Sequence, residues 1–257
     1  MPRAPVNPAV QSVSAFFPCY NDEATIGRMV EVAARTLDEC GVDGEIIVIN
    51  DGSTDGSAAV LSALSADEPK LRVVTHESNR GYGGALLSGF AAATRQWVFY
   101  TDGDAQFDPS ELVLLVDAAS DDVDVVQGYK IRRADNIARR VIGRVYHRFV
   151  AFAFGLRIRD TDCDFRLLRK ETLDRITLVH TTGVICVELV RKLQDAGARF
   201  IEVPIHHYAR EHGQSEFFRF TQVMGSLKDL VGLWVRQVLL RQREPAPVDD
   251  RTSGRAA

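Results

Sequence analysis

Short apolar runs alternate with amphipathic stretches along the first half of the chain. The runs are predicted strands, because they are rich in β-branched and aromatic residues, and they cover residues 13–17, 45–50, 71–75, 97–101 and 123–129. The stretches between them repeat apolar residues at helical spacing, over 23–40, 57–64, 83–93 and 109–119. This alternation predicts right-handed βαβ units and an α/β fold, a mostly parallel sheet flanked by helices.

Two prolines mark expected strand ends. Pro18 follows the first run and Pro204 follows a late run at 200–203, and both are predicted to stop their strands because proline cannot donate to a sheet ladder. Further helices are predicted at 134–154, 181–196 and 217–240, the last of them amphipathic.

The chain of 257 residues is predicted to hold one large domain with smaller segments around it. The expected segments are a Pro-rich lead at 1–12, the α/β domain at 13–215, an amphipathic helical extension at 216–243 and a disordered tail at 244–257.

Composition narrows the classes of function. A formal net charge of −4 argues against a nucleic-acid binder, which needs a strongly basic surface. The four cysteines are far apart in the sequence and favour neither a zinc site nor a disulfide scaffold, so a reducing cytoplasm is the expected location. No signal-peptide pattern and no run of about 18 apolar residues is present, so we expect a soluble or peripheral protein.

Asp102 and Asp104 follow directly after the strand at 97–101. Ligands bind at the carboxyl ends of strands in open α/β sheets, and two carboxylates at this spacing can face one ion. Mg²⁺ or Mn²⁺ prefers such oxygen ligands and shares them with substrate phosphates. The sequence therefore favours a metal site for a diphosphate, and the alternative is a turn whose acids only cap the next helix.

Two glycine-rich turns end the neighbouring predicted strands. In the first, NDGSTDGS, Asp51 is favoured as a ligand contact, whereas Asp55 is better explained as a helix cap. In the second, NRGYGGA, glycines permit close backbone approach and a helix begins, which suits anionic groups. Neither turn has the spacing of a dinucleotide fingerprint or a P-loop.

Taken together and in this order, these motifs resemble the inverting family 2 glycosyltransferases of GT-A (Rossmann-like) fold. Within that family they are most similar to dolichol phosphate mannose synthase and the bacterial polyprenyl phosphate glycosyltransferases. The resemblance implies two sets of donor contacts. The nucleotide sugar would be held by Pro18, Tyr20, Asp22, Glu23, Asp51, Asn79, Gly81 and Gly103, and the metal and diphosphate by Asp102, Asp104 and Gln106.

The chain departs from these relatives in two ways. Relatives often have Asp-Asp where this chain has Asn50-Asp51, and many bacterial relatives carry C-terminal transmembrane helices that this sequence lacks.

A second acidic segment, DTDCDFR at 160–166, resembles the acceptor-side element of the polyprenyl phosphate enzymes. Asp162 and Asp164 are the predicted catalytic carboxylates that act on the acceptor, with no choice made between them. Asp160 and Arg166 are predicted to contact the acceptor phosphate. A solvated acidic turn is the alternative.

The segment HHYAREHGQS at 206–215 holds half of the six histidines, but its spacing is poor for zinc. It resembles the R-x-x-G-x-S loop of the family, which implies that Arg210 and Ser215 cover the donor diphosphate. Glu188 also matches a family acid, and a partly buried helix acid explains it nearly as well.

Basic residues and the last helix raise two further expectations. Arg132 and Arg133 belong to a basic run near the metal site and are predicted to capture the acceptor phosphate, with a solvated face as the alternative. The amphipathic stretch at 217–240 would either pack on the domain or a second copy, or lie in the plane of a bilayer. We favour the membrane, with the protein peripheral on the inner face of the cell membrane.

The expected activity is transfer of a hexosyl group from a UDP- or GDP-sugar to a polyprenyl phosphate, with Mg²⁺ or Mn²⁺ and inversion at the anomeric carbon. A family 2 enzyme with a saccharide or soluble acceptor is the first alternative. A catalytically silent nucleotide-binding or membrane-docking module is the second.

Overall fold

The computed structural model describes residues 7–133, 148–161, 163–210 and 228–240. Its centre is a seven-stranded sheet with strand order β3-β2-β1-β4-β6-β5-β7. All neighbouring strands run parallel except those that pair with β6, which is antiparallel to β4 and β5. The predicted α/β architecture with a mostly parallel sheet is confirmed.

The strands and helices have the following bounds. The strands are β1 (Ser12–Cys19), β2 (Asp43–Asn50), β3 (Leu71–Thr75), β4 (Trp97–Thr101), β5 (Val125–Arg133), β6 (Phe165–Arg169) and β7 (Phe200–His207). The helices are α1 (Ile26–Cys40), α2 (Ser57–Asp67), α3 (Tyr82–Ala92), the 3₁₀ turn η1 (Pro109–Glu111), α4 (Leu112–Ala118), α6 (Lys170–Leu173) and α7 (Ile185–Asp195). Helical residues 148–154 and 228–234 and the π-helical turn η3 (Val235–Leu239) complete the described elements.

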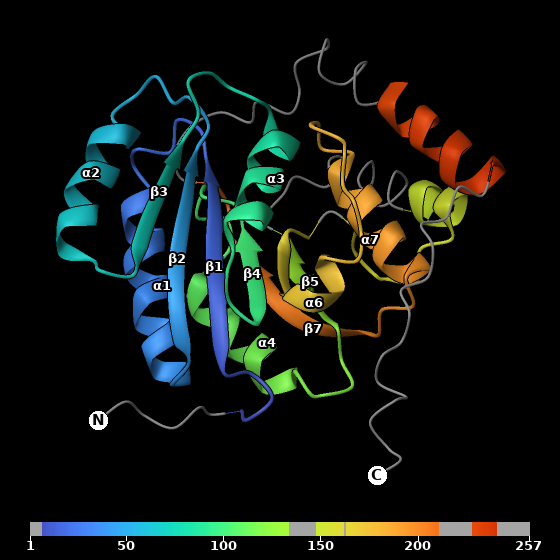
Figure 1. Ribbon diagram of the computed structural model, residues 1–257, viewed down its shortest axis with the longest axis horizontal. Coiled ribbons are helices and arrows are strands. Elements are labelled where there is room, and N and C mark those ends of the chain that lie inside the picture. Colours follow the sequence, from blue (N-terminus) through green and yellow to red (C-terminus); the bar gives the residue numbers. More distant parts are fainter. Residues whose placement is uncertain (1–6, 134–147, 162, 211–227, 241–257) are drawn as a thin grey trace.

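Helices cover both faces of the sheet (Figure 1). Helices α1 and α4 pack on one face, where Phe17, Val48 and Phe99 belong to the buried core. Helices α3, α6 and α7 cover the other face, around Phe16 and Tyr100. A sheet that is buried on both faces explains why its strands are nearly continuous apolar runs rather than alternating ones.

Two strand ends at prolines and one whole strand differ from the sequence prediction. Strand β1 continues through Pro18, where it pairs with β2 alone because its pairing with β4 has ended at Phe16. Strand β7 continues through Pro204, because β7 is an edge strand whose open side needs no N–H donor. Strand β6 was not predicted, since the buried Arg166 interrupts its apolar pattern.

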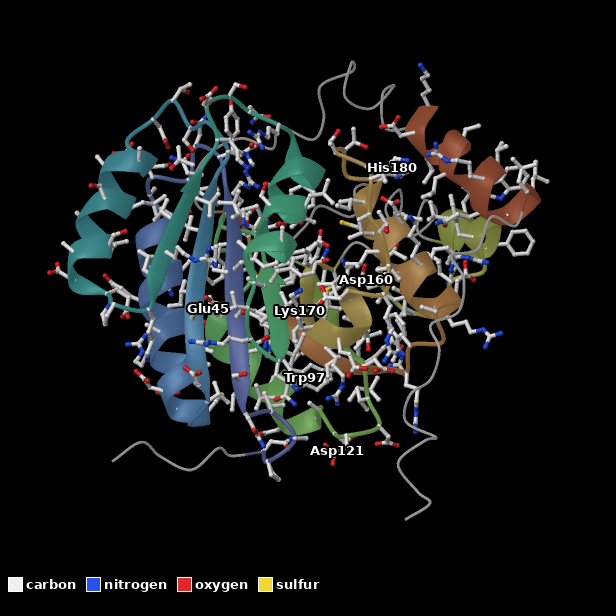
Figure 2. The ribbon with its side chains drawn as sticks, viewed as in Figure 1. Glu45, Trp97, Asp121, Asp160, Lys170 and His180 are labelled. Carbon is white, nitrogen blue, oxygen red and sulfur yellow. The ribbon has the colours of Figure 1, made fainter. Side chains whose placement is uncertain are left out.

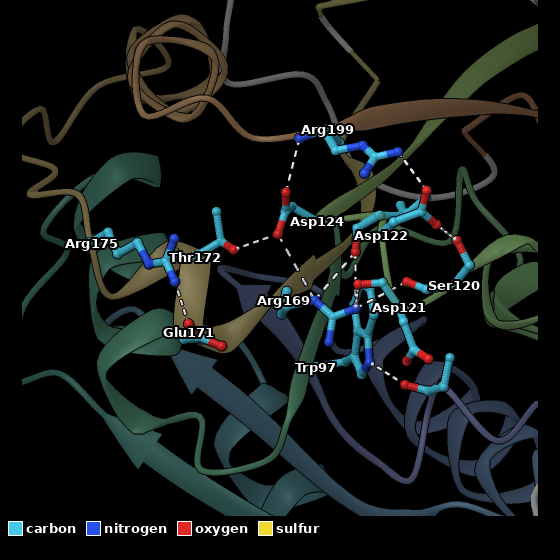
Figure 3. Close-up of polar contacts among 12 residues, drawn as sticks. Trp97, Ser120, Asp121, Asp122, Asp124, Arg169, Glu171, Thr172, Arg175 and Arg199 are labelled. Atoms are coloured by element: carbon cyan, nitrogen blue, oxygen red, sulfur yellow. Dashed lines mark hydrogen bonds and ion pairs between the residues drawn. The ribbon is translucent and has the colours of Figure 1, made fainter. Parts of the chain in front are cut away.

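The amino end of the sheet is closed by a polar cluster around Arg169 (Figure 3). Its guanidinium stacks over the Trp97 ring at 4.4 Å and donates to the carbonyls of Ser120 and Val123 at 3.0 and 3.1 Å. Asp124 accepts from the Thr172 hydroxyl at 2.8 Å in the same cluster. These contacts hold β5 and β6 together at the amino end of the sheet. The candidate site lies at the opposite end, where the parallel strands finish.

The final described helix packs on the domain beside helix 148–154 and α7 (Figure 1). Leu230 and Leu233 belong to one buried cluster with Val150, and the Trp234 indole donates to the Ala153 carbonyl at 2.9 Å. Packing on the domain therefore accounts for one face of the predicted amphipathic extension. Residues 134–147 and 211–227, which carry parts of two predicted helices, lie outside the described residues.

Candidate functional site

The site is built where β1, β2 and β4 end. Asp51 follows β2, Asp102 follows β4, and β1 lies between these strands. Neighbouring strands are about 4.8 Å apart, so two carboxylates separated by two strand spacings lie roughly 10 Å apart along this edge. Figure 2 shows His180 toward this end of the molecule and Trp97 and Asp121 toward the other.

The turn after β4 presents Asp102 and Asp104 from a fixed backbone. Ala105 has φ of 58°, the left-handed conformation that reverses the chain after the two acids. A Cβ on Gly103 would meet the Pro18 carbonyl at 2.7 Å, so glycine lets this turn lie against the end of β1. Thr25 adds a hydrogen bond of 2.8 Å from its hydroxyl to the Gly103 carbonyl.

Several carboxylates face the same region. Burial, Asp164 and Asp104 together raise the pKa of Asp102 well above its usual range. Burial and the nearby Asp104 also raise the pKa of Asp22 to about 6, against the hydrogen bond that Asp22 accepts from the Tyr20 N–H. Four acids therefore converge from three loops, and their mutual repulsion favours a cation among them.

Tyr82 is a site residue that the sequence analysis missed. Its hydroxyl donates to Asp102 Oδ1 at 2.8 Å from the first turn of α3. Burial and the Asp102 and Asp164 carboxylates raise the pKa of Tyr82 well above its usual range, so the hydroxyl keeps its proton. The only sequence signal is its place inside the glycine-rich NRGYGGA turn.

Arg210 and Gln106 tie the segment after β7 to the acidic turn. Arg210 Nη2 donates to Asp104 Oδ2, and the Gln106 backbone N–H donates to Asp104 Oδ1 at 3.1 Å. The Gln106 side-chain amide donates to the Tyr208 carbonyl at 3.2 Å. This contact gives Gln106 a role in holding the 208–210 segment, and the metal ligation expected for it stays a prediction.

Asp51 is held by two donors. His76 Nδ1 lies 2.5 Å from Asp51 Oδ1, and the Arg80 backbone N–H donates to the same oxygen at 2.9 Å. The second ring nitrogen of His76 contacts the Ser88 hydroxyl at 2.9 Å. His76 was also missed from the sequence, because a single histidine after a strand carries no motif. Asn50 accepts from the Ser53 N–H at 3.1 Å and so supports the turn itself.

Hydrogen bonds join the loop after β1 to the turn after β2. The Gly56 N–H donates to Glu23 Oε2 at 3.0 Å, and the Glu23 N–H donates to Asp55 Oδ2 at 3.1 Å. Asp55 also accepts from the Ser57 N–H at 3.0 Å, at the start of α2. These contacts give Glu23 and Asp55 a structural role, and the capping explanation favoured for Asp55 agrees with them.

The glycine-rich turn before α3 packs against residues 180–182. Gly81 has φ of +80°, and the Asn79 side chain accepts from its N–H at 2.9 Å. The Gly83 N–H donates to the Thr181 carbonyl at 2.9 Å. The close approach that these glycines permit is therefore used, at least in part, by another segment of the protein.

Arg166 is fully buried in β6, and its guanidinium forms hydrogen bonds with other residues of the protein. Nε donates to Gln127 Oε1 at 2.6 Å, and Nη2 donates to the Thr161 carbonyl at 2.7 Å. Nη1 donates to the Tyr100 hydroxyl and, at 2.8 Å, to Asp164 Oδ1. These contacts make Arg166 a residue that positions Asp164, and its expected contact with the acceptor phosphate stays a prediction.

The other residues expected on the acceptor side are placed less fully. Asp160 is buried, at 4% exposed. The strand β5 includes positions 132 and 133, but the side chains of Arg132 and Arg133 lie outside what the structure describes, as do Asp162 and Ser215. Among the described residues of the second acidic segment, Asp164 lies close enough to Asp102 to raise its pKa.

Glu188 forms part of a buried structural contact. It accepts from the His180 backbone N–H at 3.0 Å and lies 2.8 Å from His180 Nδ1, and Lys192 pairs with it at 3.1 Å. Burial by itself would raise the pKa of Glu188, but the hydrogen bonds from His180 and from the Val179 N–H lower it to about 2. The explanation of Glu188 as a buried helix acid accounts for these contacts.

The carboxylates of this site fit a hard divalent cation whose remaining ligands are water and substrate phosphate. Among the described residues, no group of three or more His, Cys, Asp or Glu side chains is arranged to hold a metal. Asp102 and Asp104 each supply a carboxylate, and Asp22 and Asp164 add negative charge nearby. Mg²⁺ and Mn²⁺ sites of this kind take one or two carboxylates and complete their shell with water and substrate phosphate.

Comparison with known proteins agrees with this fold. The model of "Glycosyl transferase family 2" matches residues 14–177. An undecaprenyl-phosphate 4-deoxy-4-formamido-L-arabinose transferase from Enterobacter sp. (strain 638) is 30% identical over 225 residues, which cover 87% of this chain and 67% of that protein. The fold and the acidic edge are those of a nucleotide-sugar-dependent glycosyltransferase. The chain belongs to glycosyl transferase family 2.

Solved structures share the fold. Glucosyl-3-phosphoglycerate synthase from Mycobacterium tuberculosis, in complex with UDP, superposes with a TM-score of 0.67 at 18% identity, over 88% of this chain and 80% of that one. The same enzyme in complex with Mn²⁺, UDP-glucose and phosphoglyceric acid gives a TM-score of 0.65 at 17% identity, over 88% and 79% of the two chains. The expected GT-A fold and the resemblance to family 2 polyprenyl phosphate enzymes are both confirmed.

Proposed function

We propose that the protein is an inverting, metal-dependent glycosyltransferase that moves a hexosyl group from a UDP- or GDP-sugar to a polyprenyl phosphate. The observation that carries this proposal is the convergence of Asp102, Asp104 and Arg210 at the carboxyl edge of the sheet, with Asp164 beside them. Three loops thus surround one place where charge on a departing diphosphate would be offset.

The donor fits the edge that these residues form. The nucleoside diphosphate would extend from Asp51, at the end of β2, to the acids at the end of β4, across the width of β1. Asp102 and Asp104 would hold Mg²⁺ or Mn²⁺, which supplies Lewis-acid stabilisation of the nucleoside diphosphate leaving group. Arg210 would contribute its positive charge to the same phosphates once donor and cation draw it from Asp104.

The transfer would be a single displacement. A phosphate oxygen of the acceptor attacks the anomeric carbon as the bond from that carbon to the diphosphate oxygen breaks, so the configuration inverts and the nucleoside diphosphate leaves. A phosphate acceptor is already an anion at neutral pH, so no strong base is required. Asp164, fixed by Arg166, would position the acceptor at the edge of the site.

A lipid acceptor is supported by the named activity of the Enterobacter relative and by an apolar surface on this chain. Phe149 and Phe152 on helix 148–154 are 65% and 89% exposed, and Val231 and Leu239 on the neighbouring C-terminal helix are 55% and 60% exposed. Arg148 and Lys228 are exposed on the same two helices, and Arg157 is exposed just after helix 148–154. Aromatic and basic side chains together suit an anionic bilayer surface. Within the described part of the chain, no helix has the length and apolarity to cross a bilayer.

Vesicle binding tests the membrane part of the proposal. Replacing Phe149 and Phe152 together by serine should reduce co-sedimentation with vesicles that contain phosphatidylglycerol severalfold. Leu114→Ser is the matched control, because Leu114 is 40% exposed on α4, away from these helices. Equal binding of the wild type, the double variant and the control would contradict a role of this apolar surface in membrane binding.

A saccharide or other soluble acceptor is the alternative, because the Mycobacterium structure with the same fold contains phosphoglyceric acid. Labelled UDP- and GDP-sugars offered with undecaprenyl phosphate in detergent, and in parallel with 3-phosphoglycerate and simple sugars, separate the two acceptors. Product only in the water-soluble fraction would favour the alternative.

The activity itself is tested at Asp104. Asp104→Ala should lower transfer about a hundredfold or more while the fold persists, since this side chain makes a partly exposed ion pair. Asp108→Ala is the control, because Asp108 lies on the same loop and caps only η1. Full transfer by Asp104→Ala, or by the wild type in EDTA, would contradict the proposal.

A further inference from the structure

The buried pair of His76 and Asp51 bears on which base the donor carries. His76 is 4% exposed and Asp51 is 3% exposed, and the ring nitrogen Nδ1 lies 2.5 Å from Asp51 Oδ1. A carboxylate only accepts, so Nδ1 carries the proton and donates it. The Ser88 hydroxyl holds the opposite ring nitrogen at 2.9 Å and fixes the direction of the ring.

Asp51 Oδ1 has no capacity left for a ligand. A carboxylate oxygen offers two lone-pair sites, and those of Oδ1 are taken by His76 Nδ1 and by the Arg80 backbone N–H at 2.9 Å. Both donors lie in the segment that follows β3, so the carboxylate is fixed in one orientation.

Asp51 Oδ2 is the oxygen that remains for a ligand. No described residue donates to this oxygen. It is not fully buried either, so it keeps contact with solvent. The carboxylate therefore offers one oxygen, not two, to whatever binds at the end of β2.

Uracil and guanine make different demands on a carboxylate. Uracil has a single ring N–H between two carbonyls, and one acceptor oxygen satisfies it. Guanine presents a ring N–H and an exocyclic amino group side by side, and this pair matches both oxygens of one carboxylate. With Oδ1 filled, guanine would leave one donor without a partner, and an unpaired donor in a binding site costs about tenfold or more in affinity.

We propose that His76 is a positioning residue that limits Asp51 to one free oxygen and so selects a uridine over a guanosine diphosphate donor. The proposal rests on the function proposed above, in which the nucleoside lies at Asp51. It assigns the base, which the sequence motifs leave open.

Calorimetric titration of the full chain with UDP and with GDP, at fixed Mn²⁺, tests this selection. The wild type should bind UDP about tenfold or more tightly than GDP. His76→Leu removes the donor and should bring the ratio of the two affinities severalfold closer to one. His76→Asn keeps an N–H near the position of Nδ1 and should preserve the ratio.

The ratio separates selection from a general structural loss. A variant that only loosens the loop would weaken both nucleotides equally and leave the ratio unchanged, and that result would overturn the proposal. So would equal or tighter binding of GDP by the wild type. Should His76→Leu fail to fold, His76→Gln serves in its place, because its longer amide reaches toward Ser88 rather than Asp51. Binding of neither nucleotide would overturn the proposed function as well, whereas binding of both without preference would overturn only the role of His76.

Discussion

Arg210 forms an ion pair with Asp104 that joins the segment after β7 to the acidic turn after β4. The Asp104 side chain is 10% exposed and that of Arg210 is 29% exposed, so the ion pair lies at the solvent-facing side of the cluster of acids. A guanidinium on Asp104 Oδ2 occupies an oxygen that the proposed cation would also use. The ion pair and the cation therefore compete for one carboxylate.

This competition predicts opposite effects of Arg210→Ala on two measurements. Without donor, the variant should bind Mn²⁺ severalfold more tightly, since a partly exposed pair contributes on the order of 1 kcal/mol. Transfer should nevertheless fall about a hundredfold, because a positive charge near the diphosphate is lost. Mn²⁺ titration without donor and initial rates with donor give the two numbers.

Arg199→Ala is the matched control for this experiment. Arg199 is also an arginine in an ion pair, 2.5 Å from Asp122, but it lies at the opposite end of the sheet (Figure 3). Its loss should change neither Mn²⁺ affinity nor transfer. Weaker Mn²⁺ binding by Arg210→Ala would show that the pair supports the site rather than competing for it.

Tyr82→Phe is expected to weaken the cation site while leaving the fold intact. The hydroxyl orients Asp102 through a hydrogen bond of 2.8 Å, and loss of such an orienting partner typically costs 10- to 100-fold in metal affinity. We expect Mn²⁺ affinity and transfer to fall by about tenfold. Tyr129→Phe is the control, because the Tyr129 ring stacks with Arg159 and takes no part in the site. Unchanged Mn²⁺ affinity in Tyr82→Phe would contradict the orienting role.

The parallel half of the fold could be predicted because its strands bury both faces. Runs such as 46–49 and 97–100 are apolar throughout, and length and β-branching then distinguish them from helices. Strand β6 was not predicted because Arg166 is its second residue, and a buried arginine is recognisable only from the partners that the tertiary fold brings to it. Pro204 was misleading because the sequence does not show which strand lies at an edge.

The candidate site was predictable only where the acids follow a strand. Asp51, Asp102 and Asp104 lie where the strand pattern placed them. Tyr82 and His76 were missed, because each acts through one hydrogen bond to an acid more than 15 residues away in the sequence. No spacing of residues in the sequence predicts such a contact, since it depends on the order of strands in the sheet.

Arg166→Leu tests whether Arg166 stabilises the fold. Its guanidinium is fully buried and satisfies Asp164, Gln127 and the Thr161 carbonyl. Removing one partner from a buried charged pair costs about 3–5 kcal/mol, so denaturant unfolding should show a loss of that order. Arg175→Leu is the control, because Arg175 pairs with the exposed Glu171 on α6 and should cost less than about 1 kcal/mol. A stable Arg166→Leu variant with weakened acceptor binding would instead support the phosphate-binding role expected from the sequence.

Glu188 should make stability depend on pH in an acidic window. Its pKa is about 2 in the folded protein, below the ordinary value of 4.5, because the hydrogen bonds from His180 and Val179 outweigh the effect of burial. A carboxylate with a depressed pKa stabilises the fold above its unfolded pKa and loses that contribution as the pH falls toward its folded pKa. Glu188→Gln should therefore be less stable than the wild type at pH 7, by about 2 kcal/mol, and the difference should shrink between pH 4.5 and 2. Urea unfolding of both proteins across this range measures the difference, and a gap that stays constant as the pH falls would show that the carboxylate charge of Glu188 does not stabilise the contact with His180.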